Sequence, residues 1–514
     1  MKKLIFLITA AGIIMGCAGC SDKPETVVNR IVPSAELSDD THLDKVKTEA
    51  TFDLDKTVPE SASEFVLNEL FTDNMMLQAN KAARVWGGCA TDGGIALAVG
   101  DSVYYGTVSG GKFSFYIGKT DYTSKTDIVF YNSKAKRTLK NVAFGELFLA
   151  GGQSNMEFKM SGNPEFEDII SVSLNPDIRL TIITNSFSDT PRDALSAKPV
   201  MGWREAAPDS VRQFSAVGYF FAAEFNRLYG VPVGVVDAAV SNTRMYTWMP
   251  EEEFADSYKD HYVASSPNFA ASKYFNGMIS PLKQMTFRSV LWYQGETEYL
   301  HFSENLKLLI SGWRRELESE NLFFAVVQLP RFTGEQQFFT AREEQRKAVI
   351  DDPHAAYSVN IDLGTLPKDI LDPSDVNGIH PLDKDKVGLR LAHTVAQYLF
   401  NAKGHWRGPV LREYKITGSG AELTFDTVGN GLELKHLLGG FEVAGADKEY
   451  ETATPEIKSH DTIKLTSGVK DIRYIRYGYS NKNAFVTGDL QSYSHSVSLY
   501  NSFGYPAEQF IIIK

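Results

Sequence analysis

Short apolar runs alternate with helix-forming segments between residues 144 and 402, and this alternation restricts the fold more than any other feature. The runs are GELFLAGG, VPVGVVDAAV, RSVLWYQGE, LFFAVVQLP and AAYSVNIDLG, and the helical segments cover 215–230, 304–320, 340–352 and 385–400. Several runs are apolar at nearly every position, which is typical of strands that are covered on both faces. The pattern predicts an α/β fold: a three-layer α/β/α sandwich with a doubly wound, flavodoxin-like parallel sheet.

Two regions outside this alternation are expected to be all-β. Residues 63–143 and 403–514 contain short strand-like runs that are separated by Gly, Asp and Ser turns. Because they flank the α/β unit of residues 144–402, we expect them to be able to pack against each other. Within that unit, residues 160–212 and 249–275 are expected to be long irregular loops near strand ends, where such loops usually build a ligand pocket.

Residues 1–20 are expected to be a lipoprotein signal peptide. Lys2 and Lys3 precede an apolar stretch that is too short to span a bilayer as a mature helix. Small residues then lead to Cys20 in a pattern that resembles a bacterial lipobox, with Cys17 as the alternative acylated residue. The chain is thus expected to be exported and held at the outer membrane or cell surface by a lipid anchor; a plain secretory signal, which would leave it periplasmic, is the alternative.

Residues 21–62 are polar without apolar periodicity and predict a flexible tether.

Charge and cysteine content exclude several classes of function. The 514 residues carry a net charge of −12, which argues against nucleic acid as a partner, because nucleic-acid-binding proteins usually present a basic face. Two of the three cysteines lie in the signal segment, so the mature part cannot form a disulfide framework, and Cys89 is expected to be a small core residue. The ten histidines are scattered without ligand spacing, and no metal or other cofactor is expected.

The stretch LAGGQSNMEF contains the strongest candidate for a catalytic residue. Ser154 follows an apolar run, at the strand end where open α/β sheets bind their ligands, and Gly151 and Gly152 allow a sharp turn there. Met156 stands where the G-x-S-x-G elbow has its last glycine, so a catalytic Ser154 indicates a different scaffold. A serine nucleophile needs a neighbouring base, and His380, in the loop between the last strand and the last helix, is the best candidate.

Six motifs then occur in a specific order along the chain: GQSNM, FSAVGYFFA, VPVGVVDA, NGMISPL, LWYQGETE and GIHPLDKDKVGLRLA. Together they resemble the SGNH-hydrolase family of carbohydrate esterases, specifically the sialate O-acetylesterase type. LFTDNMMLQANKAARVWGG near the N-terminus and SLYNSFGYPAEQF near the C-terminus are also similar to that family. The resemblance therefore covers residues 63–514, nearly the whole mature chain.

The resemblance implies an acetylesterase mechanism in which Ser154 attacks the acetyl carbonyl and His380 is the general base. It assigns the oxyanion hole to the backbone N–H of Ser154 and to the side chain of Gln294, although Gln294 is alternatively an ordinary polar residue that closes a strand. Glu296 is expected to organise the same loop or the substrate pocket rather than to act as a catalytic acid.

The sequence departs from the family pattern in the loop after the second strand. Relatives commonly read SWGGT before a tryptophan, whereas this chain has Ser241 and Asn242 in place of the two glycines. Asparagine tolerates left-handed backbone better than most residues, so Asn242 can keep the loop geometry, and its amide can donate to the oxyanion. Arg244, two residues on, would be placed to clamp a carboxylate such as that of sialic acid; the simpler interpretation is a solvated loop arginine.

A second departure concerns the acid member of the triad. The family pattern has an aspartate two or three residues before the histidine, and this chain has Asn377 and Gly378 at those positions. Asp375 is the nearest substitute to orient His380. The alternatives are a backbone carbonyl in that role or a Ser–His dyad.

The leading functional hypothesis is therefore a serine esterase that removes O-acetyl groups from carbohydrate, with 9-O-acetylated sialic acid as the substrate that the family suggests. Acetylated plant polysaccharide, such as acetyl xylan, is the alternative substrate, because fold and serine chemistry do not choose the sugar. A different class also stays open, namely a carbohydrate-binding surface lipoprotein whose hydrolase site has decayed.

Overall fold

The alternating runs of residues 144–402 form one central sheet, as the sequence predicts. The computed structural model describes residues 42–50, 52–254, 266–296, 301–332, 338–364, 378–402, 406–435, 440–479 and 497–514. The strands of the sheet are β8 (Lys136–Gly152), β9 (Asn175–Ile182), β10 (Met201–Ala206), β11 (Val233–Asp237), β12 (Ser289–Tyr293), β13 (Phe323–Val327) and β14 (Ala355–Ser358). They are ordered β10-β9-β11-β8-β12-β13-β14, with only β10 antiparallel to its neighbour among these seven strands. The predicted α/β class with a parallel sheet is confirmed.

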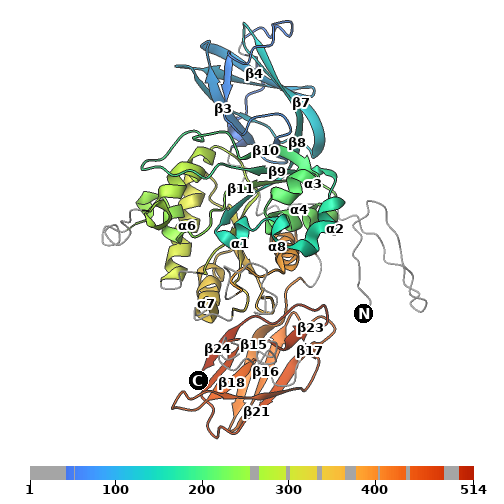
Figure 1. The fold of residues 1–514 in the computed structure, drawn as a ribbon, viewed down its shortest axis with the longest axis vertical. Helices are drawn as coiled ribbons and strands as arrows, with labels where there is room; N and C mark the ends of the chain where they lie inside the picture. The colour runs from blue at the N-terminus through green and yellow to red at the C-terminus, as the bar shows by residue number, and fades with distance from the viewer. Residues whose placement is uncertain are drawn as a thin grey trace, which may run out of the picture.

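Helices cover both faces of this sheet (Figure 1). The long ones are α4 (Ala216–Tyr229), α6 (Phe302–Glu316), α7 (Phe338–Val349) and α8 (Lys384–Leu399). Side chains of α4 and α8 pack in one hydrophobic cluster with Val235 and Leu291, whereas α6 packs in another with Val236 and Val290. Because successive side chains of a strand point to opposite faces, α4 and α8 lie on one face and α6 lies on the other.

Helix α4 shows how the sequence sets the bounds of an element. The hydroxyl of Ser215 accepts a hydrogen bond from the backbone N–H of Gly218, which caps the first turn. Gly230 ends the helix with a φ of 63°, a left-handed conformation that costs glycine little. Both boundaries match the predicted segment 215–230.

The expected irregular insert at 160–212 is wrong. It contains the edge strand β10 of the central sheet and the strand next to it, β9, together with the short helices η2 (Met160–Gly162), η3 (Pro164–Phe166), α2 (Glu167–Ser171) and α3 (Pro208–Gln213). Strand β9 does not show an apolar run because Arg179 lies in it, 1% exposed and paired with Glu205 of β10 at 3.0 Å. The described part of the second insert, 249–254 and 266–275, contains only single helical turns: η5 (Glu251–Glu253), η7 (Pro267–Phe269) and the start of η8 (Phe275–Ile279).

The N-terminal β region comprises β1 (Phe65–Leu67), β2 (Met76–Gln78), β3 (Ala83–Cys89), β4 (Gly93–Val99), β5 (Ser102–Val108), β6 (Lys112–Ile117) and β7 (Thr123–Tyr131). Strand β8 joins this region to the central sheet, because its first half pairs with β7 and its second half with β11 and β12. The expected boundary at residues 143 and 144 therefore falls inside one continuous strand. Cys89 is 3% exposed, as expected of a core residue.

Residues 42–50 and 52–62 differ from the flexible tether that the sequence suggests. They contain η1 (Leu43–Lys45), and Val46 and Glu60 form isolated β-bridges with Tyr116 and Lys136. Phe52, Leu54 and Val58 pack in a small hydrophobic cluster with Ala96 and Tyr105. Three apolar side chains without regular spacing give no periodic signal, yet they suffice to hold the segment against the sheet. Residues 21–41 lie outside the described residues.

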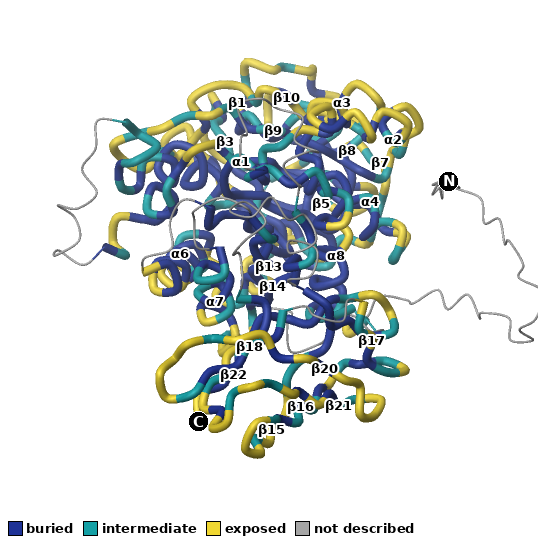
Figure 2. Tube along the Cα trace, turned by 60° about the horizontal axis from the view of Figure 1, so that its bottom comes forward, coloured by how far each residue is buried: buried dark blue, intermediate teal, exposed yellow. Residues whose placement is uncertain are grey.

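The C-terminal β region comprises β15 (Val410–Thr417), β16 (Gly420–Asp426), β17 (Leu432–Leu434), β18 (Phe441–Ala444), β19 (Glu451–Thr452), β20 (Thr454–Ile457), β21 (Thr462–Thr466), β22 (Tyr474–Tyr477), β23 (Leu499–Asn501) and β24 (Phe510–Ile513). The two β regions lie at opposite ends of the central sheet, so the expectation that they pack against each other is wrong (Figures 1 and 2). Each contacts the α/β unit instead.

Buried polar contacts attach the C-terminal β region. Arg342 of α7 is 1% exposed and donates to the carbonyl of Gly478 and to Gln509 Oε1, each at 3.0 Å. His393 of α8 contacts Glu224 of α4 at 2.6 Å and the hydroxyl of Tyr505 at 2.5 Å.

Among the residues that the structure describes, every helix falls short of the length and apolar character that a membrane crossing requires.

Candidate active site

Ser154 lies where the sequence places it, directly beyond the carboxyl end of the central strand β8. It is the first residue of the short helix α1 (Ser154–Glu157) and is half-buried. The turn before it depends on Gly152, whose φ is +130° and whose Cβ, if it had one, would lie 2.1 Å from the carbonyl oxygen of Tyr293. Only glycine fits there, so the chain can pass close to β12 and present Ser154 at the sheet edge.

The loops that follow β8, β11 and β12 meet at this edge. The backbone N–H of Gln153 donates to the carbonyl of Tyr293 at 3.2 Å, and that of Val240 donates to the carbonyl of Gly152 at 3.1 Å. The carboxylate of Glu157 accepts a hydrogen bond of 2.7 Å from the backbone N–H of Ser241. The serine loop is therefore fixed from both sides by backbone contacts.

Asn155 connects the serine loop to the loop that carries His380. Asn155 is fully buried, and its side-chain amide donates to the carbonyl of Ile379 at 2.9 Å and to Glu296 Oε1 at 2.6 Å. The residue after Ser154 thus contacts the residue before His380. His380 itself is half-buried in the turn that precedes α8. The structure brings the two predicted catalytic residues to the same edge of the sheet.

Gln294 and Asn242, both predicted for the oxyanion hole, lie on the two neighbouring loops. Gln294 is 1% exposed and donates one amide hydrogen to the carbonyl of Thr243 at 2.7 Å, and a carboxamide has a second N–H to offer. Asn242 is exposed and has a φ of +57°, so it adopts the left-handed backbone that the sequence suggested. Gln294 thereby ties the Asn242 loop to the end of β12.

Two carboxyl groups are buried at the strand ends. Glu296 is fully buried, and burial raises its pKa to about 7 although Asn155 and Lys384 act in the opposite direction. Asp237, at the end of β11, has its pKa raised to about 7 mainly by burial, against a hydrogen bond of 3.0 Å from the backbone N–H of Ala239. The contact of Glu296 with Asn155 places Glu296 beneath the serine loop, where the sequence suggested an organising residue.

The remaining predicted site residues are Arg244, Asp375 and Cys20. Arg244 is half-buried before η4 (Met245–Trp248), and its guanidinium carbon lies 5.7 Å from the centre of the Phe269 ring. Asp375, the candidate acid, and Cys20, the candidate lipidation site, lie outside the described residues. Their roles stay predictions.

The sequence does not single out two residues that the structure places at the site, Asn155 and Lys384. Lys384 is the first residue of α8, is fully buried, and donates through Nζ to Asn155 Oδ1. One signal was available in advance: the first turn of a helix favours acidic rather than basic side chains, so a lysine at that position is a local inconsistency that points to a specific partner.

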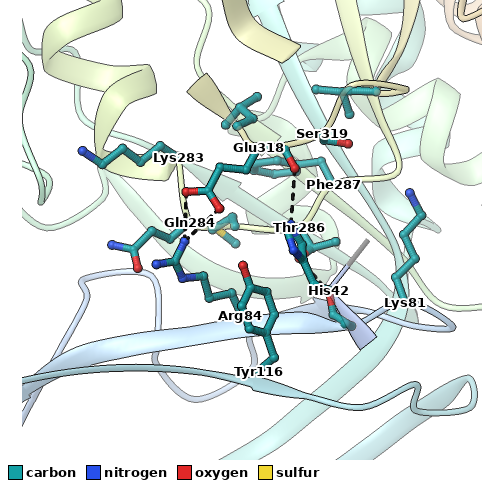
Figure 3. A pocket seen from close by; sticks show the side chains of 14 residues that line it. His42, Lys81, Arg84, Tyr116, Lys283, Gln284, Thr286, Phe287, Glu318 and Ser319 are labelled. Atoms are coloured by element: carbon teal, nitrogen blue, oxygen red, sulfur yellow. Dashed lines mark hydrogen bonds and ion pairs between the residues drawn. The ribbon is translucent and has the colours of Figure 1, made fainter. Parts of the chain in front are cut away.

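A separate pocket lies at the opposite ends of the strands, between the N-terminal β region and the α/β unit (Figure 3). It is lined in part by residues 283–287, which precede β12, and by residues from 317–322, which precede β13. Arg84 forms an ion pair with Glu318 at 3.3 Å, and His42 contacts the carbonyl of Glu318 at 3.3 Å. None of the predicted site residues that the structure describes lines this pocket, and its polar contacts join the two regions.

A serine loop, an amide loop and a histidine loop that meet at the carboxyl edge of a parallel sheet are the arrangement that an α/β serine hydrolase needs. A family model described as carbohydrate esterase, sialic acid-specific acetylesterase, matches residues 144–372. The match confirms the family resemblance for residues 144–372. The matched range contains Ser154, Asn242 and Gln294 and ends before His380.

Individual relatives agree with the family. The sialate O-acetylesterases of Pongo abelii and Homo sapiens are each 23% identical to this chain over 289 residues, which is 49% of this chain and 53% of the relative. The chain thus spans about half the length of these two relatives. A solved carbohydrate acetylesterase from Xanthomonas citri is 26% identical with a TM-score of 0.76, and the match covers 87% of this chain and 99% of that one.

Proposed function

We propose that this protein is a serine esterase that removes O-acetyl groups from carbohydrate through an acetyl-enzyme intermediate. The observation that carries the proposal is the meeting of the loops of Ser154, Gln294 and His380 at one sheet edge, where Asn155 joins them. The family match and the likeness to a carbohydrate acetylesterase of nearly equal extent support it.

In the proposed reaction, the hydroxyl oxygen of Ser154 attacks the acetyl carbonyl carbon while His380 accepts the hydroxyl proton. The tetrahedral intermediate collapses with cleavage of the bond between the acetyl carbon and the sugar oxygen, and His380 gives its proton to that oxygen. Water then attacks the acetyl-enzyme with His380 as base, which releases acetate and restores Ser154. Asp375 is the proposed orienting acid, and a Ser–His dyad is the alternative.

The proposed oxyanion hole consists of the backbone N–H of Ser154, the second amide hydrogen of Gln294 and the side chain of Asn242. Gln294 is the most constrained of the three, because its contact with Thr243 fixes the orientation of the amide plane. Donors that are oriented before the reaction stabilise the developing charge without reorganisation, and the loss of one typically costs about 10²–10³ in rate.

For the substrate we propose 9-O-acetylated sialic acid first, with Arg244 as the contact for its carboxylate. The description of the matching family and the position of Arg244 on the loop beside Asn242 support this choice. Acetyl xylan, which has no such carboxylate, is the alternative. Arg244→Ala is expected to raise KM for the sialate more than tenfold and to leave KM for a neutral acetyl ester within twofold.

The test is acetate release by the chain from residue 42 onward, measured on 4-nitrophenyl acetate and then on the two natural ester classes. Ser154→Ala is expected to abolish hydrolysis, and the exposed Ser311→Ala on α6 is the matched control that should keep it. Equal or faster turnover of acetyl xylan would remove the sialate proposal. A wild-type protein that binds acetylated sugar without releasing acetate would instead support the decayed binding module, which the replacement of two glycines by Ser241 and Asn242 motivates.

We also propose that the chain is exported and anchored by acylation of Cys20. The lipobox-like sequence before Cys20 supports this proposal. Metabolic labelling with a radioactive fatty acid is expected to label the wild-type protein and the Cys17→Ser variant but not Cys20→Ser. Label that depends on Cys17, or the absence of any label, would contradict it.

A further inference from the structure

A buried amide between two buried ionisable side chains links the loops of the active site. Three fully buried residues lie at the carboxyl edge of the sheet. Asn155 is in α1 after β8, Glu296 follows β12, and Lys384 is the first residue of α8. The three residues come from different parts of the chain, and none of them is a nucleophile, base or oxyanion donor in the proposed reaction.

The oxygen of the Asn155 side chain accepts one hydrogen bond, and its nitrogen donates two. Its Oδ1 accepts from the ammonium group of Lys384, and its Nδ2 donates to the carboxylate of Glu296 at 2.6 Å and to the carbonyl of Ile379 at 2.9 Å. A carboxamide has two N–H donors, and both are used. A cation on the oxygen side and a carboxyl on the nitrogen side hold the amide in a single orientation.

The environment of Lys384 strengthens this arrangement. Its Nζ lies 5.0 Å from the centre of the Phe158 ring and 5.5 Å from that of Tyr293, which is the range of favourable cation–π contact. A buried ammonium is costly unless it is paired and hydrogen-bonded. The fold therefore retains a buried lysine at the first turn of α8, directly after the turn of His380.

We propose that Asn155, held between Lys384 and Glu296, is a positioning residue that fixes Ser154 relative to His380. Asn155 is covalently next to Ser154, and the carbonyl that it binds belongs to Ile379, next to His380. A displacement of one loop against the other would therefore break this hydrogen bond. Misplacement of a catalytic group by about 1 Å can cost roughly 10²-fold in rate, so the network acts on kcat.

This inference rests on the proposed esterase function. The test compares Asn155→Leu, which keeps the branched shape of the side chain and removes all three hydrogen bonds, with wild type on 4-nitrophenyl acetate. The burst of nitrophenol counts competent sites, so that kcat is obtained per active site and is not confused with unfolded protein. We expect kcat to fall about 100-fold while KM changes less than threefold.

The matched control is Asn501→Leu in the C-terminal β region. Asn501 is also fully buried and donates to the carbonyls of Arg407 and Thr427. Its replacement is expected to lower the melting temperature and to leave kcat within twofold of wild type. A purely structural role of Asn155 would give the same result as this control.

The charges are tested by Lys384→Met, Glu296→Gln and their combination. Each single change leaves the opposite ionisable group buried without its counterpart, whereas the double variant removes both. We expect kcat to fall at least tenfold in each single variant. In the double variant we expect kcat to be at least fivefold higher than the value obtained by multiplying the two separate losses.

A folded Asn155→Leu variant with kcat within threefold of wild type would overturn the inference. If that variant does not fold, the same result for Lys384→Met would overturn it. In both cases an active wild type shows that the proposed function survives. A wild type that releases no acetate would overturn the proposed function and this inference together.

Discussion

A Cβ atom on Gly152 would lie 2.1 Å from the carbonyl oxygen of Tyr293. This contact shows how closely the serine loop follows the neighbouring strand, because no side chain fits between them. Gly152 also has a φ of +130°, where L side chains are strained. The position of Ser154 therefore depends on a residue with no chemical function of its own.

Gly152→Ala is expected to lower the melting temperature and to reduce kcat for acetyl ester hydrolysis by at least tenfold, because the loop of Ser154 must move away from Tyr293. Gly202→Ala is the control. Gly202 is exposed on the edge strand β10, and a Cβ there meets nothing within 4 Å. Equal kcat values for the two variants would show that the serine loop tolerates the shift.

Gln294→Leu is expected to lower kcat by about 10²–10³, which is the usual cost of a lost oxyanion donor. The matched control is Gln78→Leu in the N-terminal β region. Gln78 is also 1% exposed and donates to the buried Glu146 at 3.0 Å. Its loss should reduce the free energy of unfolding without changing kcat. If Gln294→Leu lowers the free energy of unfolding without lowering kcat, Gln294 is a polar residue that closes β12 and is not an oxyanion donor.

Asp237 should make the free energy of unfolding depend on pH. Burial raises its pKa to about 7, so the folded protein holds a proton that the unfolded chain loses near pH 4. The unfolded chain thus binds fewer protons in this window, and stability falls as pH rises from about 4 to 7. Each pKa unit is worth about 1.4 kcal/mol.

Asp237→Asn keeps an oxygen acceptor for the backbone N–H of Ala239 and removes the ionisation. Denaturant titrations at pH 5 and pH 8 should show a smaller loss of stability in this variant than in wild type. The exposed Asp351→Asn variant is expected to behave like wild type. A loss that is unchanged in Asp237→Asn would assign the pH dependence to other groups.

The buried ion pair of Arg288 and Glu146 supports the amino-terminal side of the central sheet. The two side chains are 5% and 0% exposed, and a second contact of 3.1 Å joins Arg288 Nη2 to the carboxylate. Arg288→Met leaves a buried carboxylate without its cation and is expected to cost about 3–5 kcal/mol of unfolding free energy. The double variant with Glu146→Gln should recover part of this loss. A double variant that is no more stable than Arg288→Met would contradict the pairing.

Periodicity predicted the sheet and its helices well, because their apolar patterns are local. It missed β9 because Arg179, a buried ion-pair partner of Glu205, interrupts the apolar pattern of that strand. It also missed the packing of residues 42–62, since Phe52, Leu54 and Val58 show no regular spacing. An apolar face indicates that a strand is buried, but it does not indicate which surface covers that face. The sequence alone therefore cannot distinguish contact between the two β regions from contact of each region with the α/β unit.

The sequence likewise predicts some residues of the candidate site and misses others. Ser154, Gln294 and His380 are indicated by motifs and by their positions at strand ends, and the structure places them on loops of one edge. Asn155 and Lys384 are linked through a contact between residues 229 positions apart in the sequence. No pattern within a short window contains such a contact, and only the fold brings the buried lysine beneath the serine loop.

The most direct test of the central claim is the identity of the acetylated residue. Wild-type protein is mixed with 4-nitrophenyl acetate, quenched in acid during the burst and digested for mass spectrometry. The account predicts one acetyl group on the peptide that contains Ser154, and none on that peptide in Ser154→Ala. Rapid hydrolysis with an acetyl group on another residue, or with an unmodified Ser154 throughout the burst, would contradict it.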